Sequence, residues 1–162
     1  MTLEVFTCRI GTRAARDPDV LLVTREEADA EGVVGVFAPS WAILRPVLDA
    51  RKNQRRGFVF GISNEDRAQA LEEARAIELA AWREYVPAFL AEMRVSYRRH
   101  RPEWDRVLGR GRVVLACACK SPDRCHRTIL AARIFPALGA TYGGELVSTR
   151  TTIHLERVEI AA

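Results

Sequence analysis

The sequence predicts an α/β protein with a Rossmann-like three-layer fold and a mainly parallel sheet. Short β-rich segments alternate with helical stretches, and strand, helix and strand follow one another at the C-terminal end. The continuously apolar segment Arg112–Cys117 is typical of a strand covered on both faces. The sequence contains no repeat and no interdomain linker, so we expect a single α/β domain over residues 1–162.

Short strands and one helix are expected in the N-terminal part of the chain. Segments rich in β-forming residues predict strands at Leu3–Cys8, Val20–Thr24, Val33–Phe37 and Phe58–Ile62. Between the last two, Ser40 is a candidate N-cap for a helix that runs through Leu44 and Leu48.

Helices dominate the middle of the chain. Ser63 begins the longest helical pattern, which continues to about His100, and Pro87 is expected to break it or to start a second helix. The remaining predicted elements are a short helix from Pro102 to Gly109, the strand Arg112–Cys117, a helix from Cys125 to about Leu138 that Gly139 ends, and one or two β segments within Thr141–Ile160.

Composition and charge limit the classes of function. The net charge is +4 and the pI is about 9.2, which permits a phosphate-bearing ligand or nucleic acid without requiring one. No apolar run approaches the ~20 residues of a membrane helix, and the N-terminus lacks the pattern of a secretory signal. Three of the four cysteines fall within nine residues, which favours one thiol site over separate disulfides. We therefore expect a cytoplasmic protein with no membrane partner.

The segment from Leu115 to Arg127 is the strongest candidate for a functional site. Cys117 and Cys119 are two residues apart, so on a strand they point to the same face, at the carboxyl end where α/β proteins bind ligands. The next helix begins near Cys125, and its free N–H groups attract anions and lower the pKa of a nearby thiol. Arg124 and Arg127 add positive charge to the same corner.

Three functional interpretations compete with a purely structural one. The first is an anion or nucleotide pocket, and the second is a zinc site formed by Cys117, Cys119, Cys125 and His126. In the third, a cysteine acts as nucleophile with His126 as acid or base. In the structural interpretation the cysteines are small buried hydrophobic residues and His126 caps the helix.

The segment Leu115–Ala131 resembles the C-terminal motif of the DUF488 family. Members typically carry an apolar strand ending in Cys-x-Glu, a short loop with Asp and Pro, and then Cys-His-Arg at the start of a helix. The resemblance matches Cys117, Cys125, His126 and Arg127 to this motif, whereas Cys119 stands where many members have Glu. It implies a Rossmann-like three-layer fold and no particular reaction.

We expect a small anionic or nucleotide-like ligand at the carboxyl ends of the strands and possible chemistry on it; the oligomeric state is left open. The candidate reactive residues are Cys117, Cys119 and His126. The candidate binding residues are Cys125, Arg127, Arg124, Ser40, Trp41, Cys8 and Arg9. No cofactor is expected in this interpretation. The alternative is a zinc-bearing, non-enzymatic module that binds nucleic acid or protein.

Overall fold

A five-stranded sheet organises the computed structural model, which describes residues 2–25, 35–56, 63–149 and 152–158. The strands are β1 (Glu4–Arg9), β2 (Val20–Leu22), β3 (Arg112–Cys117), β4 (Thr141–Ser148) and β5 (Ile153–Glu156). Their order is β2-β3-β1-β4-β5, and only β5 is antiparallel to its neighbour. The predicted α/β class with a mainly parallel sheet is therefore confirmed.

The helical elements lie between and beside these strands. They are the 3₁₀ turn η1 (Arg13–Arg16), α1 (Trp41–Arg56), α2 (Asn64–Arg99), α3 (Arg101–Leu108), α4 (His126–Ile129), the π-helical segment η2 (Leu130–Ile134) and α5 (Phe135–Ala137). The segments α4, η2 and α5 follow one another without a break and form the predicted helix. No helix in the described ranges is long and apolar enough to cross a membrane.

The two faces of the sheet are covered unequally. Alternate residues of β3 point to opposite faces, so Val113, Leu115 and Cys117 join the large core with α2 and α4, whereas Val114 and Ala116 join a small cluster around η1. Among the described residues, the longer helices therefore cover one face, and η1 with its neighbours covers the other.

The helix α2 spans the predicted range but is continuous where the sequence predicts a break. Ser63 caps it as expected, since its hydroxyl accepts a hydrogen bond from the Asp66 N–H at 3.1 Å. The expected break at Pro87 is wrong, because α2 passes through this residue. A proline removes one helical hydrogen bond, whereas the buried rings of Trp82, Tyr85 and Phe89 stack at helical spacing on either side of Pro87 and hold the helix to the sheet.

The strand expected at Val33–Phe37 is wrong in the part that the structure describes. Residue 35 has no regular structure and residues 36–38 form a bend, and Phe37 instead packs its ring 4.7 Å from that of Trp104. Apolar residues there serve the core without pairing to the sheet. Residues 33–34 and the segment predicted at Phe58–Ile62 lie outside the described residues.

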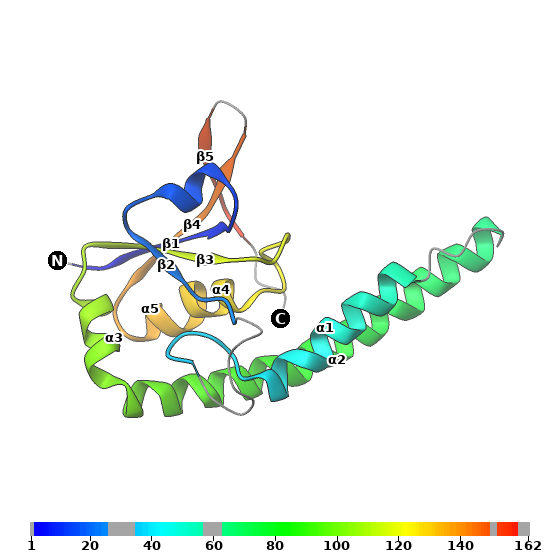
Figure 1. Ribbon diagram of the computed structural model, residues 1–162, viewed down its shortest axis with the longest axis horizontal. Coiled ribbons are helices and arrows are strands. Elements are labelled where there is room, and N and C mark those ends of the chain that lie inside the picture. Colours follow the sequence, from blue (N-terminus) through cyan, green and yellow to red (C-terminus); the bar gives the residue numbers. More distant parts are fainter. Residues whose placement is uncertain (1, 26–34, 57–62, 150–151, 159–162) are drawn as a thin grey trace.

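The C-terminal part contains the expected strand, helix and strand. β3 and β4 are both parallel to β1 and lie on either side of it. Gly139 ends the connecting helix with a φ of +92°, a conformation that favours glycine. At the other end of the molecule, α1 and α2 lie side by side as an arm that extends away from the sheet (Figure 1).

Candidate functional site

A cleft of about 500 Å³ opens where the carboxyl ends of β1 and β3 meet the base of the α1–α2 arm. β1 contributes its last residue, Arg9, which is the register partner of Cys117. The other lining residues are Leu48, Arg51 and Lys52 of α1, Glu78 of α2, and Ala118, Cys119, Lys120, Ser121 and Arg124 of the loop after β3. The cleft thus lies at the edge of the sheet that the sequence predicts for a ligand.

Positive charge dominates the cleft. Five of the lining residues named above are basic, and Glu78 is the acidic one. Arg51 and Arg124 both contact Glu78, at 3.0 Å and 3.4 Å. Within the described part of the chain, Arg9 and Lys120 have no acidic partner. The cleft therefore has cationic groups to offer to an anion.

The loop that forms the cleft floor is held through three of its backbone carbonyls. Arg51 donates to the Arg124 carbonyl at 2.5 Å, and Arg127 donates to the Cys119 carbonyl at 3.0 Å. The Thr128 hydroxyl donates to the Pro122 carbonyl at 2.7 Å. Donors from α1 and α4 thereby fix a loop that has no regular secondary structure of its own.

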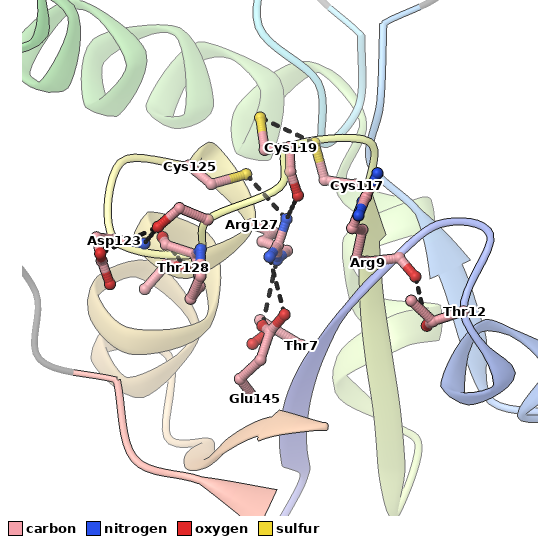
Figure 2. A network of polar contacts seen from close by, with 12 residues as sticks. Thr7, Arg9, Thr12, Cys117, Cys119, Asp123, Cys125, Arg127, Thr128 and Glu145 are labelled. Atoms are coloured by element: carbon pink, nitrogen blue, oxygen red, sulfur yellow. Dashed lines mark hydrogen bonds and ion pairs between the residues drawn. The ribbon is translucent and has the colours of Figure 1, made fainter. Parts of the chain in front are cut away.

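Arg127 lies beneath the cleft and does not line it. Its side chain is fully buried and donates two hydrogen bonds to the carboxylate of Glu145 in β4, at 3.2 Å and 2.8 Å (Figure 2). Burial alone would lower its pKa, but Cys125 and Glu145 raise it, so the guanidinium stays charged. Arg127 thus connects the sheet to the loop that carries Cys119.

Three cysteines and one histidine gather at the floor of the cleft. The sulfurs of Cys117 and Cys119 lie 3.8 Å apart. The sulfurs of Cys117 and Cys125 and a ring nitrogen of His126 all lie within 4.8 Å of one another. All three residues are buried. Cys119 is half-buried and faces the cleft. Cys117, Cys125 and His126 thus have the composition and spacing to hold a metal ion.

Two arginines donate hydrogen bonds to sulfurs of this group. Arg127 Nη1 lies 3.5 Å from Cys125 Sγ, and Arg51 Nη1 lies 3.7 Å from Cys119 Sγ. Hydrogen bonds from Cys119 and Cys125 hold the pKa of the Cys117 thiol well below its ordinary value. Burial raises the pKa of Cys125. The cluster can thus hold negative charge, with Cys117 as its favoured location.

His126 is fixed by the backbone just after β2. Its Nε2 lies 2.6 Å from the Val23 carbonyl, and because a carbonyl only accepts, Nε2 carries the proton. The ring also packs edge-on against Phe89 at 5.8 Å. Burial lowers the pKa of His126, so the ring is neutral and its lone pair is on Nδ1.

Tyr85 brings a further polar group to the cluster. Its side chain is buried, and among the described residues its hydroxyl is the buried polar atom that has no hydrogen-bond partner. Burial, and then the charges of Cys125, Cys117 and Cys119, raise the pKa of this hydroxyl. The Tyr85 ring stacks on that of Phe89, which packs edge-on against His126.

The structure separates the remaining sequence candidates from the cleft. Cys8 lies on the opposite face of the sheet, in the cluster around η1, where burial raises its pKa to about 11. Ser40 is buried, and its backbone N–H and hydroxyl both donate to Glu92. The Trp41 ring lies beneath the guanidinium of Arg45, at 5.9 Å. Arg9, Cys119 and Arg124 are the predicted residues that line the cleft.

Sequence reasoning missed the contributions of distant elements. Arg51 and Glu78 lie in amphipathic helical patterns, where charged residues are ordinarily interpreted as solvated. Glu145 could have been recognised from the sequence as a functional or paired residue, because it is a lone carboxylate within the strand-forming segment β4. Tyr85 gave none, since an aromatic residue at helical spacing is most often part of a core.

Comparison with known proteins gives one match. No curated protein and no solved structure matches the chain. A family model matches residues 67–135, a segment that runs from within α2 through α3 and β3 to the first residue of α5. The segment contains Cys117, Cys119, Cys125, His126 and Arg127. The predicted resemblance is thereby confirmed: residues 67–135 match the model of DUF488-N3a, described as the active DUF488-N3 subclade.

Proposed function

We propose that this protein binds a small phosphate-bearing ligand of the nucleotide type in the cationic cleft and acts on it through the thiol of Cys119. We also propose that the fold is a Rossmann-like three-layer fold. The mainly parallel strands and the cleft at their carboxyl ends support this. We further propose a cytoplasmic location, since four free thiols suit a reducing compartment.

The observation that carries the proposal is the charge of the cleft. Hydrogen bonds to charged groups are the strong ones, and phosphate recognition relies on arginine and lysine donors. Arg9 and Lys120 have no acidic partner in the described ranges, so a ligand would supply the missing counter-charge. The volume of about 500 Å³ is within the range of small-molecule sites.

The thiol of Cys119 supports chemistry on such a ligand. It is the half-buried cysteine of the cluster, and it lines the cleft beside Lys120 and Arg124. The guanidinium of Arg51 donates to its sulfur at 3.7 Å, and cysteine is an intrinsically strong nucleophile. A ligand held by the cleft cations would therefore lie against the thiol of Cys119.

Binding of nucleoside monophosphates and diphosphates, with inorganic phosphate and unphosphorylated nucleosides as comparisons, tests the proposal by titration calorimetry at low salt. We expect phosphate-bearing compounds to bind and nucleosides to bind weakly. Arg9→Gln is expected to weaken binding by about tenfold or more, since a hydrogen bond to a charged group contributes about 1.5–3 kcal/mol. Cys119→Ser is expected to retain binding and to lose turnover of the bound compound.

Arg133→Gln is the matched control, because Arg133 lies in η2 and lines a different cavity. It should bind the nucleotides as the wild type does. Absence of binding at low salt, or equal weakening by Arg9→Gln and Arg133→Gln, contradicts the proposal.

In a second candidate function, the protein is a non-enzymatic module and the same cations bind the phosphate backbone of a nucleic acid. A zinc ion would then hold the loop after β3 in place. The basic lining and the metal-ligand geometry of the thiol cluster favour this second function. Gel shifts with single-stranded and duplex oligonucleotides at increasing salt separate the two candidates. Steeply salt-dependent binding of oligonucleotides, without binding of mononucleotides, favours the module.

A further inference from the structure

The geometry at the cleft floor points to a zinc site, and we propose that Cys117, Cys119, Cys125 and His126 hold one zinc ion in tetrahedral coordination. The site shares Cys119 with the chemistry proposed for the cleft, so the thiolate that acts on a bound ligand there would be a zinc-bound one, whereas Arg9 and Lys120, which would hold the anion, are not metal ligands. The function of the zinc site is to fix the loop after β3, which carries the cleft residues Cys119 to Arg124, to the start of α4.

The spacing of the ligand atoms fits a tetrahedral ion. With Zn–S bonds of about 2.3 Å, two sulfurs of a tetrahedral site lie about 3.8 Å apart. The sulfurs of Cys117 and Cys119 lie at 3.8 Å. The ligand atoms of Cys117, Cys125 and His126 lie within 4.8 Å of one another, so a small inward movement completes the coordination. Cys119, whose sulfur lies 3.8 Å from that of Cys117, would supply the fourth ligand from the side of the cleft.

The surroundings of the cluster match those of a metal centre. A metal-binding histidine ordinarily donates its other ring N–H to a carbonyl or carboxylate. The Nε2 of His126 donates to the Val23 carbonyl at 2.6 Å, which leaves Nδ1 as the ligand atom. Since the Zn²⁺ ion with three thiolates carries a net charge of −1, the site needs a cation nearby, and Arg127 and Arg51 donate to Cys125 and Cys119.

The buried hydroxyl of Tyr85 is an independent indication of a missing group. A buried donor without a partner costs about 1–3 kcal/mol, so native proteins rarely keep one. The Tyr85 hydroxyl is in this state within the described residues, and the Tyr85 ring stacks on that of Phe89, which packs edge-on against the His126 ring. Zinc-bound thiolates accept hydrogen bonds far better than neutral thiols do, so the hydroxyl of Tyr85 finds its acceptor when the ion is bound.

The test is the metal content of the full-length chain purified without chelator. We expect about one zinc per chain, since a site of three cysteines and a histidine binds zinc tightly at neutral pH. Cys117→Ser and Cys125→Ser are expected to lower this to below about one tenth per chain. Cys8→Ala is the matched control, because Cys8 is buried on the other face of the sheet, and it should keep the full content.

Titration of the metal-free wild type with cobalt(II) keeps the test informative if a variant does not fold. We expect the visible absorption of tetrahedral cobalt and a near-ultraviolet thiolate-to-cobalt band, both displaced by one equivalent of zinc. A wild-type chain that carries no zinc as purified and shows no tetrahedral cobalt spectrum overturns the proposal, as does a Cys117→Ser variant that keeps its zinc.

Discussion

Arg127 links the sheet, the loop and the thiol cluster. Its guanidinium contacts the carboxylate of Glu145, the carbonyl of Cys119 and the sulfur of Cys125, all from a fully buried position. Such a side chain cannot reach solvent for its hydrogen bonds, so its partners fix its position. Arg127 thereby sets the conformation of the loop that forms the cleft floor.

Removing Glu145 is expected to be costly. Glu145→Ala leaves the Arg127 guanidinium buried without its carboxylate and should lower the free energy of unfolding by about 3–5 kcal/mol in urea titrations. Arg127→Met combined with Glu145→Leu should recover part of this loss, because a buried ion pair can be replaced by apolar packing. Asp105→Ala, which removes an exposed ion pair with Arg101, should change stability little. Equal effects of the Glu145 and Asp105 variants would contradict this account of Arg127.

At the scale of elements, the pairing of β1 with β4 depends on two glycines. The register shifts between Val5 and Phe6, which face Tyr142 and Gly144, so Gly143 is the extra residue of a bulge. A Cβ on Gly143 would lie 2.2 Å from the Phe6 ring. Gly144 has a φ of +120°, and a Cβ there would lie 2.6 Å from the Glu156 carbonyl oxygen of β5. The bulge therefore precedes Glu145 and helps to direct it toward Arg127.

Gly144→Ala is expected to be more damaging than Gly11→Ala. Both glycines have positive φ, and a residue with a Cβ costs roughly 1–2 kcal/mol in the left-handed region. A Cβ on Gly11 meets open space, whereas one on Gly144 meets backbone that a rotamer change cannot move. We expect a loss of about 1 kcal/mol for Gly11→Ala and of about 3 kcal/mol for Gly144→Ala. Thermal and urea unfolding measure both, and similar losses would contradict the steric role of Gly144.

At the scale of the whole molecule, the cleft exists because the α1–α2 arm meets the sheet at the carboxyl ends of β1 and β3 (Figure 1). Glu78 joins the parts: it is buried on α2 and contacts Arg51 of α1 and Arg124 of the loop. One carboxylate thus holds together two helices and a loop that are far apart in the sequence, and it keeps two of the cleft cations in place.

Glu78→Ala is expected to loosen the loop without unfolding the sheet. It leaves Arg51 and Arg124 close together without their shared counter-ion, and the loss of stability should be roughly 2 kcal/mol, because both cations are partly solvated. Hydrogen exchange should become faster in residues 118–124 and stay slow in β1 and β3. Glu84→Ala, on an exposed position of the same helix, is the control. Unchanged exchange in the loop would show that Glu78 does not brace it.

Sequence patterns over a few neighbouring residues were sufficient to predict much of the fold. The apolar run of Arg112–Cys117 predicted β3 with its bounds, since a strand covered on both faces has no polar positions. Ser63 and Gly109 marked the ends of helices through ordinary cap chemistry. Pro87 misled the prediction of α2, because the stack of Trp82, Tyr85 and Phe89 on the sheet is a tertiary contact that outweighs the local preference of one residue.

The sequence by itself determined the α/β class, most of the strands and the position of the thiol segment at the end of β3. These follow from periodicity, capping and residue spacing, which act over a few neighbouring positions. Only the tertiary structure decided that Arg127 is buried against Glu145 and that Arg51, Glu78 and Arg9 meet the loop at the cleft. Such pairings join residues tens of positions apart, and they depend on how the helices pack on the sheet, which no local pattern encodes.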